Sequence, residues 1–310
     1  MSLGTTGDAR PPADRRPVPC PVCTSAEHHV VYEPWRDVHD PLALYGAASG
    51  VPGTQCIVRC AECGMIYENP RYPEDVIRSG YESSREGGHD SQYPMRVDSF
   101  YRALRRNAAQ LPPRGAKVLD VGTAGGAFLE AARRFGYDAQ GLEPSRYLVE
   151  QGARRGLDVR QGTIEAHTFD ASSFDLVCLW DVIEHLCHPR AALERLRPLL
   201  RADGRLLVNY PDIGTWQARF AGRRFWWIIS VHLHHFSRVT LKALLDRTGF
   251  EAVSFKRYWQ RLELGYLEDM AAHYGVPLAR VAAGLTPTMI RRLPLPYYAS
   301  QTTAIARLRR

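Results

Sequence analysis

Four cysteines near the N-terminus have the spacing of a metal site. Cys20 and Cys23 form one Cys-x-x-Cys pair, and Cys60 and Cys63 form a second pair beyond residues 24–59. Two such pairs supply four thiolates around a tetrahedral zinc ion and leave no open coordination position. The sequence therefore predicts a structural zinc ribbon, with a ribbon that touches substrate or nucleic acid as the alternative. Three other side chains could take part in the zinc site: Cys56, His28 and His29.

A glycine-rich turn, Gly122-Thr-Ala-Gly-Gly126, follows a short apolar run at residues 117–121. Small residues allow the backbone to approach a ligand, and the N-terminus of the predicted helix that follows presents free N–H groups. Glu143 lies about 20 residues further on, where a carboxylate accepts hydrogen bonds from ribose hydroxyls. The pattern predicts a nucleoside cofactor. A dinucleotide fold is an alternative, but Asp120 at the turn disfavours a pyrophosphate site.

Short apolar runs alternate with helical patterns through the middle of the chain. Strands are predicted at residues 117–121, 139–142, 174–180 and 204–210, and around Val159. Helices are predicted over most of 72–111 and at 128–135, 147–155, 191–200, 239–247 and 262–274, with Ser237 as the N-cap before 239–247. Strands that alternate with helices indicate βαβ units, and hence a parallel sheet with helices on both faces.

Taken in chain order, four segments resemble the successive motifs of class I S-adenosylmethionine-dependent methyltransferases. They lie at residues 119–126, 141–144, 174–186 and 199–208. The resemblance covers residues 115–257 and implies an α/β fold with a Rossmann-like seven-stranded sheet in the order 3-2-1-4-5-7-6. The last strand, expected at 302–308, would be antiparallel. The family's Gly-x-Gly-x-Gly motif has Ala124 in place of its second glycine.

The same resemblance implies a cofactor site. Gly122, Thr123 and Gly126 would line the methionine end of S-adenosylmethionine, beside Asp120. Glu143 would hold the ribose. The remaining cofactor contacts that the resemblance implies are Thr163 and Ile164 at the adenine and Trp180 near the methyl centre.

Methyl transfer to an oxygen or carbon nucleophile usually needs a base. The predicted catalytic residues are Asp181, which faces the methyl centre by resemblance, and two histidines, His185 and His232. For His185, which stands in a Glu-His-Leu stretch common to the family, a structural role near the cofactor is an equal alternative. His232, His234 and His235 could be metal ligands, but no carboxylate stands at ligand spacing.

A subgroup of these enzymes carries an N-terminal cysteine ribbon and includes the C-methyltransferases of deoxysugar biosynthesis. Those proteins have Tyr-x-Glu-His where residues 229–232 read Ile-Ser-Val-His, so only His232 matches. The missing tyrosine and glutamate argue against sugar C-methylation and favour O- or N-methylation. The run from Arg223 to Trp227 resembles a broad set of bacterial ribbon-containing methyltransferases, many of them linked to glycan or natural-product pathways.

The chain is predicted to contain four parts: a flexible leader (1–17), the ribbon domain (18–70), a helical cap or linker (71–113) and the methyltransferase domain (114–310). Two lid insertions are expected within the last part, at 211–237 and 258–300. The aromatic and arginine residues of 214–236 could stack on a substrate ring and pair with phosphate. They could equally form the core of a lid, or an interface with a membrane or another subunit.

The net charge is +7, with a pI near 9.1, but the arginines form no basic run. No signal peptide or run long enough to span a membrane is recognised, so a cytoplasmic location is expected. The function expected is O-methylation of a sugar-containing or natural-product small molecule, with S-adenosylmethionine as cofactor and a structural zinc. Phosphorylated and nucleotide-linked forms of the substrate are both open. The alternatives are an RNA base methyltransferase whose ribbon binds RNA, a sugar C-methyltransferase, and a non-catalytic binding protein. Nucleic acid is disfavoured because no Asn/Asp-Pro-Pro-aromatic motif follows residues 174–180.

Overall fold

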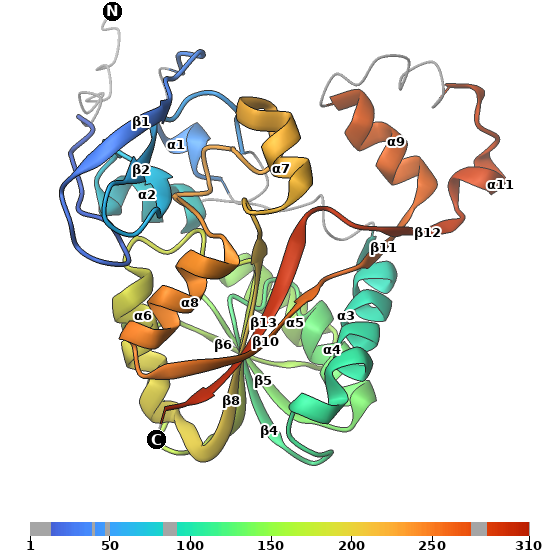
Figure 1. The fold of residues 1–310 in the computed structure, drawn as a ribbon. Coiled ribbons are helices and arrows are strands. Elements are labelled where there is room, and N and C mark those ends of the chain that lie inside the picture. Colours follow the sequence, from blue (N-terminus) through green and yellow to red (C-terminus); the bar gives the residue numbers. More distant parts are fainter. Residues whose placement is uncertain (1–13, 39–40, 47–49, 83–91, 274–283, 310) are drawn as a thin grey trace, which may run out of the picture.

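A twisted seven-stranded sheet with helices on both faces forms the centre of the structure, a computed structural model (Figure 1). The structure describes residues 14–38, 41–46, 50–82, 92–273 and 284–309. The strands run in the order β6 (Asp158–Gln161), β5 (Asp138–Glu143), β4 (Lys117–Val121), β7 (Phe174–Trp180), β8 (Leu200–Pro211), β13 (Gln301–Leu308) and β10 (Phe250–Arg257). β13 is antiparallel to both of its neighbours. The predicted order 3-2-1-4-5-7-6, with an antiparallel last strand, is confirmed.

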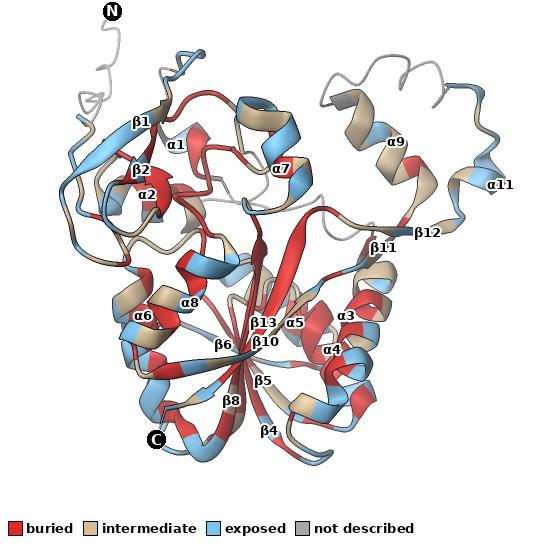
Figure 2. Ribbon diagram, viewed as in Figure 1, coloured by how far each residue is buried: buried red, intermediate tan, exposed pale blue. Residues whose placement is uncertain are grey.

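The central strands are buried because helices cover both faces of the sheet, as the red interior of Figure 2 shows, whereas the edge strands β6 and β10 are mostly not. β7 is an almost unbroken apolar run with nearly every residue buried, as expected for a central parallel strand. The helices on one face are α3 (Tyr93–Asn107), α4 (Ala127–Phe135) and α5 (Arg146–Arg154). Those on the other face are α6 (Pro189–Leu196) and α8 (Arg238–Arg247).

Above the carboxyl ends of β4, β5 and β7 lie the smaller elements (Figure 1). A four-stranded antiparallel sheet consists of β1 (His28–Tyr32), β2 (Ile57–Cys60), β3 (Ile66–Glu68) and β9 (His234–His235). A two-stranded sheet pairs β11 (Gln260–Glu263) with β12 (Pro294–Tyr297). The remaining helices are α1 (Pro41–Leu44), α2 (Glu74–Glu82), α7 (Trp216–Ala221), α9 (Leu264–His273) and α11 (Thr288–Arg291).

Several predicted boundaries differ from the structure. The helix predicted at 191–200 ends at Leu196 and continues as a 3-10 turn, because Pro198 cannot donate a helical hydrogen bond. The helix predicted at 262–274 begins only at Leu264, since β11 pairs with β12 just before it. Most of the predicted leader (residues 1–13) and residues 83–91 and 274–283 lie outside the described part of the chain, whereas Arg16 pairs with Arg71.

Ser237 is the N-cap of α8, as predicted. Its side chain accepts a hydrogen bond from the Thr240 N–H, and the Thr240 hydroxyl accepts one from the Ser237 N–H. This capping box fixes the point where the histidine-containing segment 229–235 ends and the helix begins.

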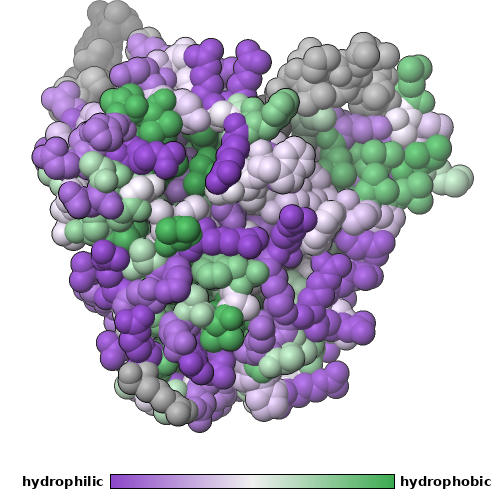
Figure 3. Space-filling view, in the orientation of Figure 1, coloured by the Kyte–Doolittle hydropathy of each residue, from purple (hydrophilic) through white to green (hydrophobic). Residues whose placement is uncertain are grey.

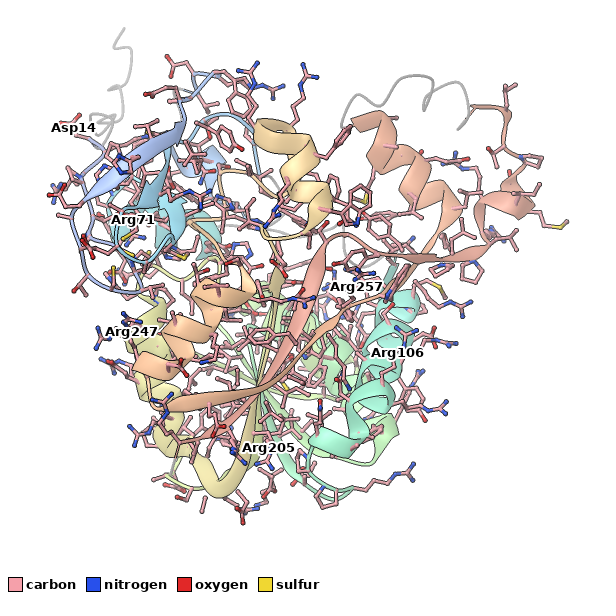
Figure 4. All side chains as sticks on the ribbon, viewed as in Figure 1. Asp14, Arg71, Arg106, Arg205, Arg247 and Arg257 are labelled. Carbon is pink, nitrogen blue, oxygen red and sulfur yellow. The ribbon has the colours of Figure 1, made fainter. Side chains whose placement is uncertain are left out.

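Hydrophilic and hydrophobic side chains are interspersed over much of the face shown in Figure 3. Arg106, Arg205, Arg247 and Arg257 lie well apart around the sheet domain in Figure 4. Hydrophobic side chains gather over α11 and β12 in Figure 3, where Met289 and Leu293 are exposed. In the described residues, no helix is both long and apolar enough to cross a membrane.

Candidate functional site

A cavity of about 1600 Å³ opens at the carboxyl ends of β4, β5 and β7. Ten of the residues predicted for cofactor binding or catalysis line it: Asp120, Gly122, Thr123, Glu143, Thr163, Ile164, Trp180, Asp181, His185 and His232. Gly126, also predicted to touch the cofactor, is not among the lining residues and instead caps the N-terminus of α4. We call the part around Asp120, Gly122 and Glu143 the cofactor half, and the part around His185 and His232 the acceptor half.

The glycine turn requires residues without side chains. Gly122 has φ +69°, and a Cβ there would lie 2.7 Å from Val182 Cγ2. Gly126 has φ +86°, and a Cβ there would lie 2.4 Å from Leu157 Cδ1. Ala124 also has a positive φ, of 49°, which a small L-residue tolerates at some cost. The turn therefore brings bare backbone to the cavity wall, where the main chain can approach a ligand closely.

Two buried carboxyl groups lie beside this turn. Glu143, at the end of β5, accepts hydrogen bonds from the N–H groups of Ala124 (2.9 Å) and Ser145 (3.0 Å). Each oxygen can accept a further bond, as a ribose diol requires. Burial raises the pKa of Asp120 to about 8, so this side chain is largely protonated at neutral pH and can donate a hydrogen bond.

Aromatic rings form the wall where the cofactor half meets the acceptor half. The Trp180 ring lies 4.9 Å from Phe100, 5.4 Å from Phe128 and 5.3 Å from Tyr258, measured between centroids. Phe100 and Tyr258 come from α3 and from the end of β10, so elements distant in sequence complete this wall. Sequence reasoning identified Trp180 but neither of these two partners, because their distance along the chain hides the contact.

Asp181 stands directly after β7 in a left-handed conformation, with φ +54°. Its Oδ1 accepts hydrogen bonds from Asn209 Nδ2 (2.7 Å) and Gln301 Nε2 (2.6 Å). Burial raises its pKa, and the nearby Arg96 guanidinium opposes that shift. A carboxyl group held by two amides is an oriented acceptor at the junction of the two halves.

His232 and His185 face each other across the acceptor half. Their rings meet edge to face at 4.7 Å, and Trp227 stacks on His232 at 5.5 Å. His232 Nδ1 bonds to the Trp227 carbonyl (2.9 Å), and His185 Nδ1 bonds to the Val231 carbonyl (2.8 Å) and contacts the Tyr81 hydroxyl. When Nδ1 carries the proton toward a carbonyl, Nε2 is left as the acceptor.

Both imidazoles are neutral at pH 7. Burial lowers the pKa of His185 to about 4. Burial, with the neighbouring His185 and His235, lowers the pKa of His232 well below its usual value. A neutral imidazole has a lone pair that can accept a hydroxyl proton, and the same burial opposes the positive charge that forms, so the pair can act as a base only where the site stabilises that charge.

Glu184 adds a carboxyl group to this pair. Its side chain is 1% exposed, and among the described residues neither oxygen finds a hydrogen-bond partner. Burial, and then the charge of Asp181, raises the pKa of Glu184 well above its usual value. Ligand atoms of Glu184, His185 and His232 lie within 4.8 Å of one another, so the group could also hold a divalent cation. The sequence near His232 contains no carboxylate at ligand spacing. In the structure, Glu184 supplies one from the turn after β7.

The other histidines of the 229–235 segment turn away from the cavity. His234 Nε2 bonds to the Leu186 carbonyl at 2.9 Å, and His235 is buried in β9. Neither lines the cavity. The structure therefore separates His232, on the cavity wall, from His234 and His235, whose backbone belongs to the ribbon sheet.

The residues of the predicted lid at 211–237 divide into two groups. Trp226 and Trp227 donate hydrogen bonds to the Ala299 carbonyl, and Arg223 and Arg224 line the cavity mouth. Further residues of this segment point outward: Trp216 is 68% exposed and Phe220 is 91% exposed.

The four predicted zinc ligands come together as expected for such a site. The Cys20 and Cys63 sulfurs are 3.5 Å apart, those of Cys23 and Cys60 are 3.4 Å apart, and all four lie within 4.8 Å of one another. A tetrahedral zinc–thiolate site needs sulfur separations of about 3.8 Å. The arrangement is consistent with a zinc site, and Cys56, His28 and His29 are not part of the cluster.

The match to known proteins agrees with this geometry. The family model described as a methyltransferase domain matches residues 92–255, just over half of the chain. This chain belongs to that methyltransferase family. The match covers the glycine turn, Glu143 and the Asp181–His185 turn, and the sheet is the Rossmann-like sheet of class I S-adenosylmethionine-dependent methyltransferases.

Curated relatives resemble part of the chain. A ubiquinone biosynthesis O-methyltransferase of Azorhizobium caulinodans is 30% identical over 121 residues, covering 36% of this chain and 47% of the relative. One from Actinobacillus pleuropneumoniae is 34% identical over 106 residues, covering 31% of this chain and 45% of the relative. The chain thus spans about half the length of the curated relatives that it matches.

Solved structures share the fold at low sequence identity. The 1,6-didemethyltoxoflavin-N1-methyltransferase of Burkholderia thailandensis, solved with S-adenosylhomocysteine, aligns with TM-score 0.50 and 15% identity over 81% of this chain and 98% of its own. A Haloferax volcanii putative methyltransferase complexed with the Trm112 activator matches with TM-score 0.52 and 16% identity, covering 74% of this chain and all of the matched chain.

Proposed function

We propose that the protein transfers a methyl group from S-adenosylmethionine to a hydroxyl group of a small molecule, of the sugar-containing or natural-product type. The observation that carries this proposal is the joint cavity, in which a neutral histidine pair faces the same space as the glycine turn and Glu143. Family membership supports methyl transfer. The O-methyltransferase names of the curated relatives favour oxygen as the accepting atom.

Each half would contribute a different part of the chemistry. The turn at Gly122 and the Glu143 carboxylate would hold the cofactor, which supplies an electrophilic methyl group when bound. His232 would accept the hydroxyl proton of the substrate at Nε2, because its Nδ1 is engaged by the Trp227 carbonyl. Asp181 and Tyr81 would orient the reacting groups, and alignment of this kind accounts for much of the rate in such reactions.

The alternatives have less support in the acceptor half. The positions that carry tyrosine and glutamate in the deoxysugar C-methyltransferases hold Ile229 and Val231, with Ser230 between them. The Ser230 hydroxyl is buried and donates to the Leu44 carbonyl at 2.5 Å, which removes it as a base. For RNA, the support is weaker because the arginines form no basic run in the sequence. We assign the four cysteines to a structural zinc ion, since their sulfurs leave no open position.

Calorimetry with S-adenosylhomocysteine tests the cofactor assignment. The protein should bind this product, and Glu143→Ala should weaken binding by about 10- to 100-fold, because a buried carboxylate would no longer hold the ribose. Glu150→Ala, on the exposed face of α5, is the matched control and should leave the affinity unchanged. No binding to the wild-type protein at hundreds of micromolar would overturn the proposal.

A further inference from the structure

We propose that Gln55 is a positioning residue that couples the four-cysteine ribbon to the histidine loop, which we define as residues 229–235. Through this residue the metal-bound ribbon holds His232 at the cavity wall. The inference deepens the proposed function, because it assigns the ribbon a part in building the acceptor half as well as in folding.

The Gln55 side chain lies at the centre of the contact. Its Nε2 donates to Glu68 Oε2 (3.2 Å) and to the carbonyls of Ser230 (3.3 Å) and His232 (3.0 Å). Gln55 is 2% exposed and Glu68 is 1% exposed, so water does not compete for these bonds. Two N–H groups thus serve three buried acceptors, two of which belong to the histidine loop.

The backbone continues the same contact. β3 pairs with β9 through Ile66 opposite His235 and Tyr67 opposite His234. The Glu68 N–H then donates to the Leu233 carbonyl at 2.9 Å. The end of the histidine loop, His234–His235, is therefore the fourth strand of the ribbon sheet, although the two segments are far apart in the sequence.

The cysteine site closes the opposite end of the same hairpin. Cys60 ends β2, Cys63 lies in the turn, and the Cys60 N–H donates to the Met65 carbonyl at 2.8 Å. Ile57 pairs with Glu68 at the open end, next to Gln55. A metal that fixes the turn therefore fixes the register of the strands that carry the Gln55 and Glu68 contacts.

The far side of the histidine loop rests on the turn after β7. The Glu184 carbonyl accepts hydrogen bonds from the N–H groups of Leu233 (2.9 Å) and His234 (3.2 Å). The loop is therefore clamped between the ribbon and the methyltransferase sheet. Without the ribbon, the carbonyls of Ser230 and His232 would lose their Gln55 donor in a buried position, which destabilises this loop conformation.

Hydrogen exchange of the full chain tests the coupling without any substrate. Gln55→Met keeps the size of the side chain and all four cysteines but removes the donor. Amides of residues 229–235 should then exchange about tenfold faster, as expected for buried carbonyls left unpaired. The matched control is Gln151→Met, which should leave exchange unchanged. The Gln151 side-chain amide donates to the Tyr147 hydroxyl on the same helix.

Metal removal provides the second arm. Treating the wild-type protein with a chelator should raise exchange in the same loop, and adding Zn²⁺ alone should restore protection. Carboethoxylation of His232, followed by mass spectrometry against His188 as an internal standard, should accelerate in Gln55→Met. The affinity for S-adenosylhomocysteine should stay within twofold of wild type. Faster modification with unchanged affinity would show that the substitution displaces His232 without damaging the cofactor half.

Faster exchange of residues 229–235 in both arms supports the proposal; in the chelator arm it should be accompanied by faster exchange in the ribbon strands β2 and β3, whose register the metal fixes. Unchanged exchange there in either arm overturns it, and so does a rise spread evenly over β4, β5 and β7, which would make Gln55 a residue of general stability. None of these readouts requires methyl transfer. A protein that fails to bind S-adenosylhomocysteine would overturn the proposed function and leave the coupling intact.

Discussion

The two halves of the cavity are built in different ways. The cofactor half comes from consecutive elements: β4, the glycine turn, α4 and the end of β5 place Gly122 and Glu143 together. The acceptor half combines Tyr81 of α2, the turn at His185 and the histidine loop, and the ribbon supports it from outside. Local chain geometry therefore builds the half of the cavity where we propose that the methyl donor binds, whereas long-range packing builds the half that we propose holds the acceptor.

The largest expected effect separates the two halves by chemistry. His232→Ala should lower turnover on a hydroxyl acceptor by about 10²- to 10⁴-fold, the usual contribution of a general base. The dissociation constant of S-adenosylhomocysteine should change less than twofold, because His232 lies outside the cofactor half. The measurements are radiolabelled methyl transfer to a panel of hydroxyl compounds, and calorimetry.

His234→Ala is the matched control for that experiment. His234 lies two residues away, is equally buried and does not line the cavity. Full turnover in His232→Ala, or an equal loss in both variants, would remove His232 from the role of base.

The converse change should weaken ligand binding in the cofactor half and leave the structure of the acceptor half intact. Gly122→Val should weaken S-adenosylhomocysteine binding by about 100-fold, because φ +69° strains a β-branched residue and its Cβ would lie 2.7 Å from Val182. Exchange protection of residues 229–235 should be retained. Gly284→Ala, where an added Cβ meets nothing within 4 Å, is the control. Wild-type affinity in Gly122→Val would show that the cofactor binds elsewhere.

Measured per pH unit, the smallest effect is a pH dependence of stability that has opposite sign in the two halves. Burial raises the pKa of Asp120 to about 8, so its contribution to stability decreases as pH rises from about 4 to 8. Burial lowers the pKa of His185 to about 4, so its contribution decreases as pH falls from about 6.5 to 4. In urea unfolding, the free energy of unfolding of Asp120→Asn should increase relative to wild type as pH rises. That of His185→Gln should increase relative to wild type as pH falls. Each gain is at most about 1.4 kcal/mol per pH unit, and the same sign in both would contradict the assignment.

The same contrast explains how much the sequence could predict. The seven-strand order could be predicted through the family resemblance that the motifs carry. The predicted cofactor residues Gly122 and Glu143 lie at one cavity because glycine, acid and apolar run stand close together in those motifs. The sequence also singled out His232. It could not reveal that Trp227 stacks on this ring or that Glu184 lies beside it, because those contacts depend on how the loop folds back.

Two short elements illustrate the limit further. β9 has only two residues, too few for any periodicity, and it exists because β3 offers an edge to pair with. β11 occupies the start of a segment with a helical pattern, since its partner β12 arrives from more than 30 residues away. In both cases pairing with a distant strand determines the local structure.

The central claim is that the two halves form one site, and NMR of the histidine rings tests it most directly. The His232 and His185 resonances, assigned through the His232→Ala and His185→Gln variants, should shift when S-adenosylhomocysteine saturates the protein. His28 and His29, on the exposed β1 strand of the ribbon, should not shift. If the product binds while His232 and His185 stay unchanged, the methyl donor does not occupy the cavity that these histidines face, and the account is contradicted.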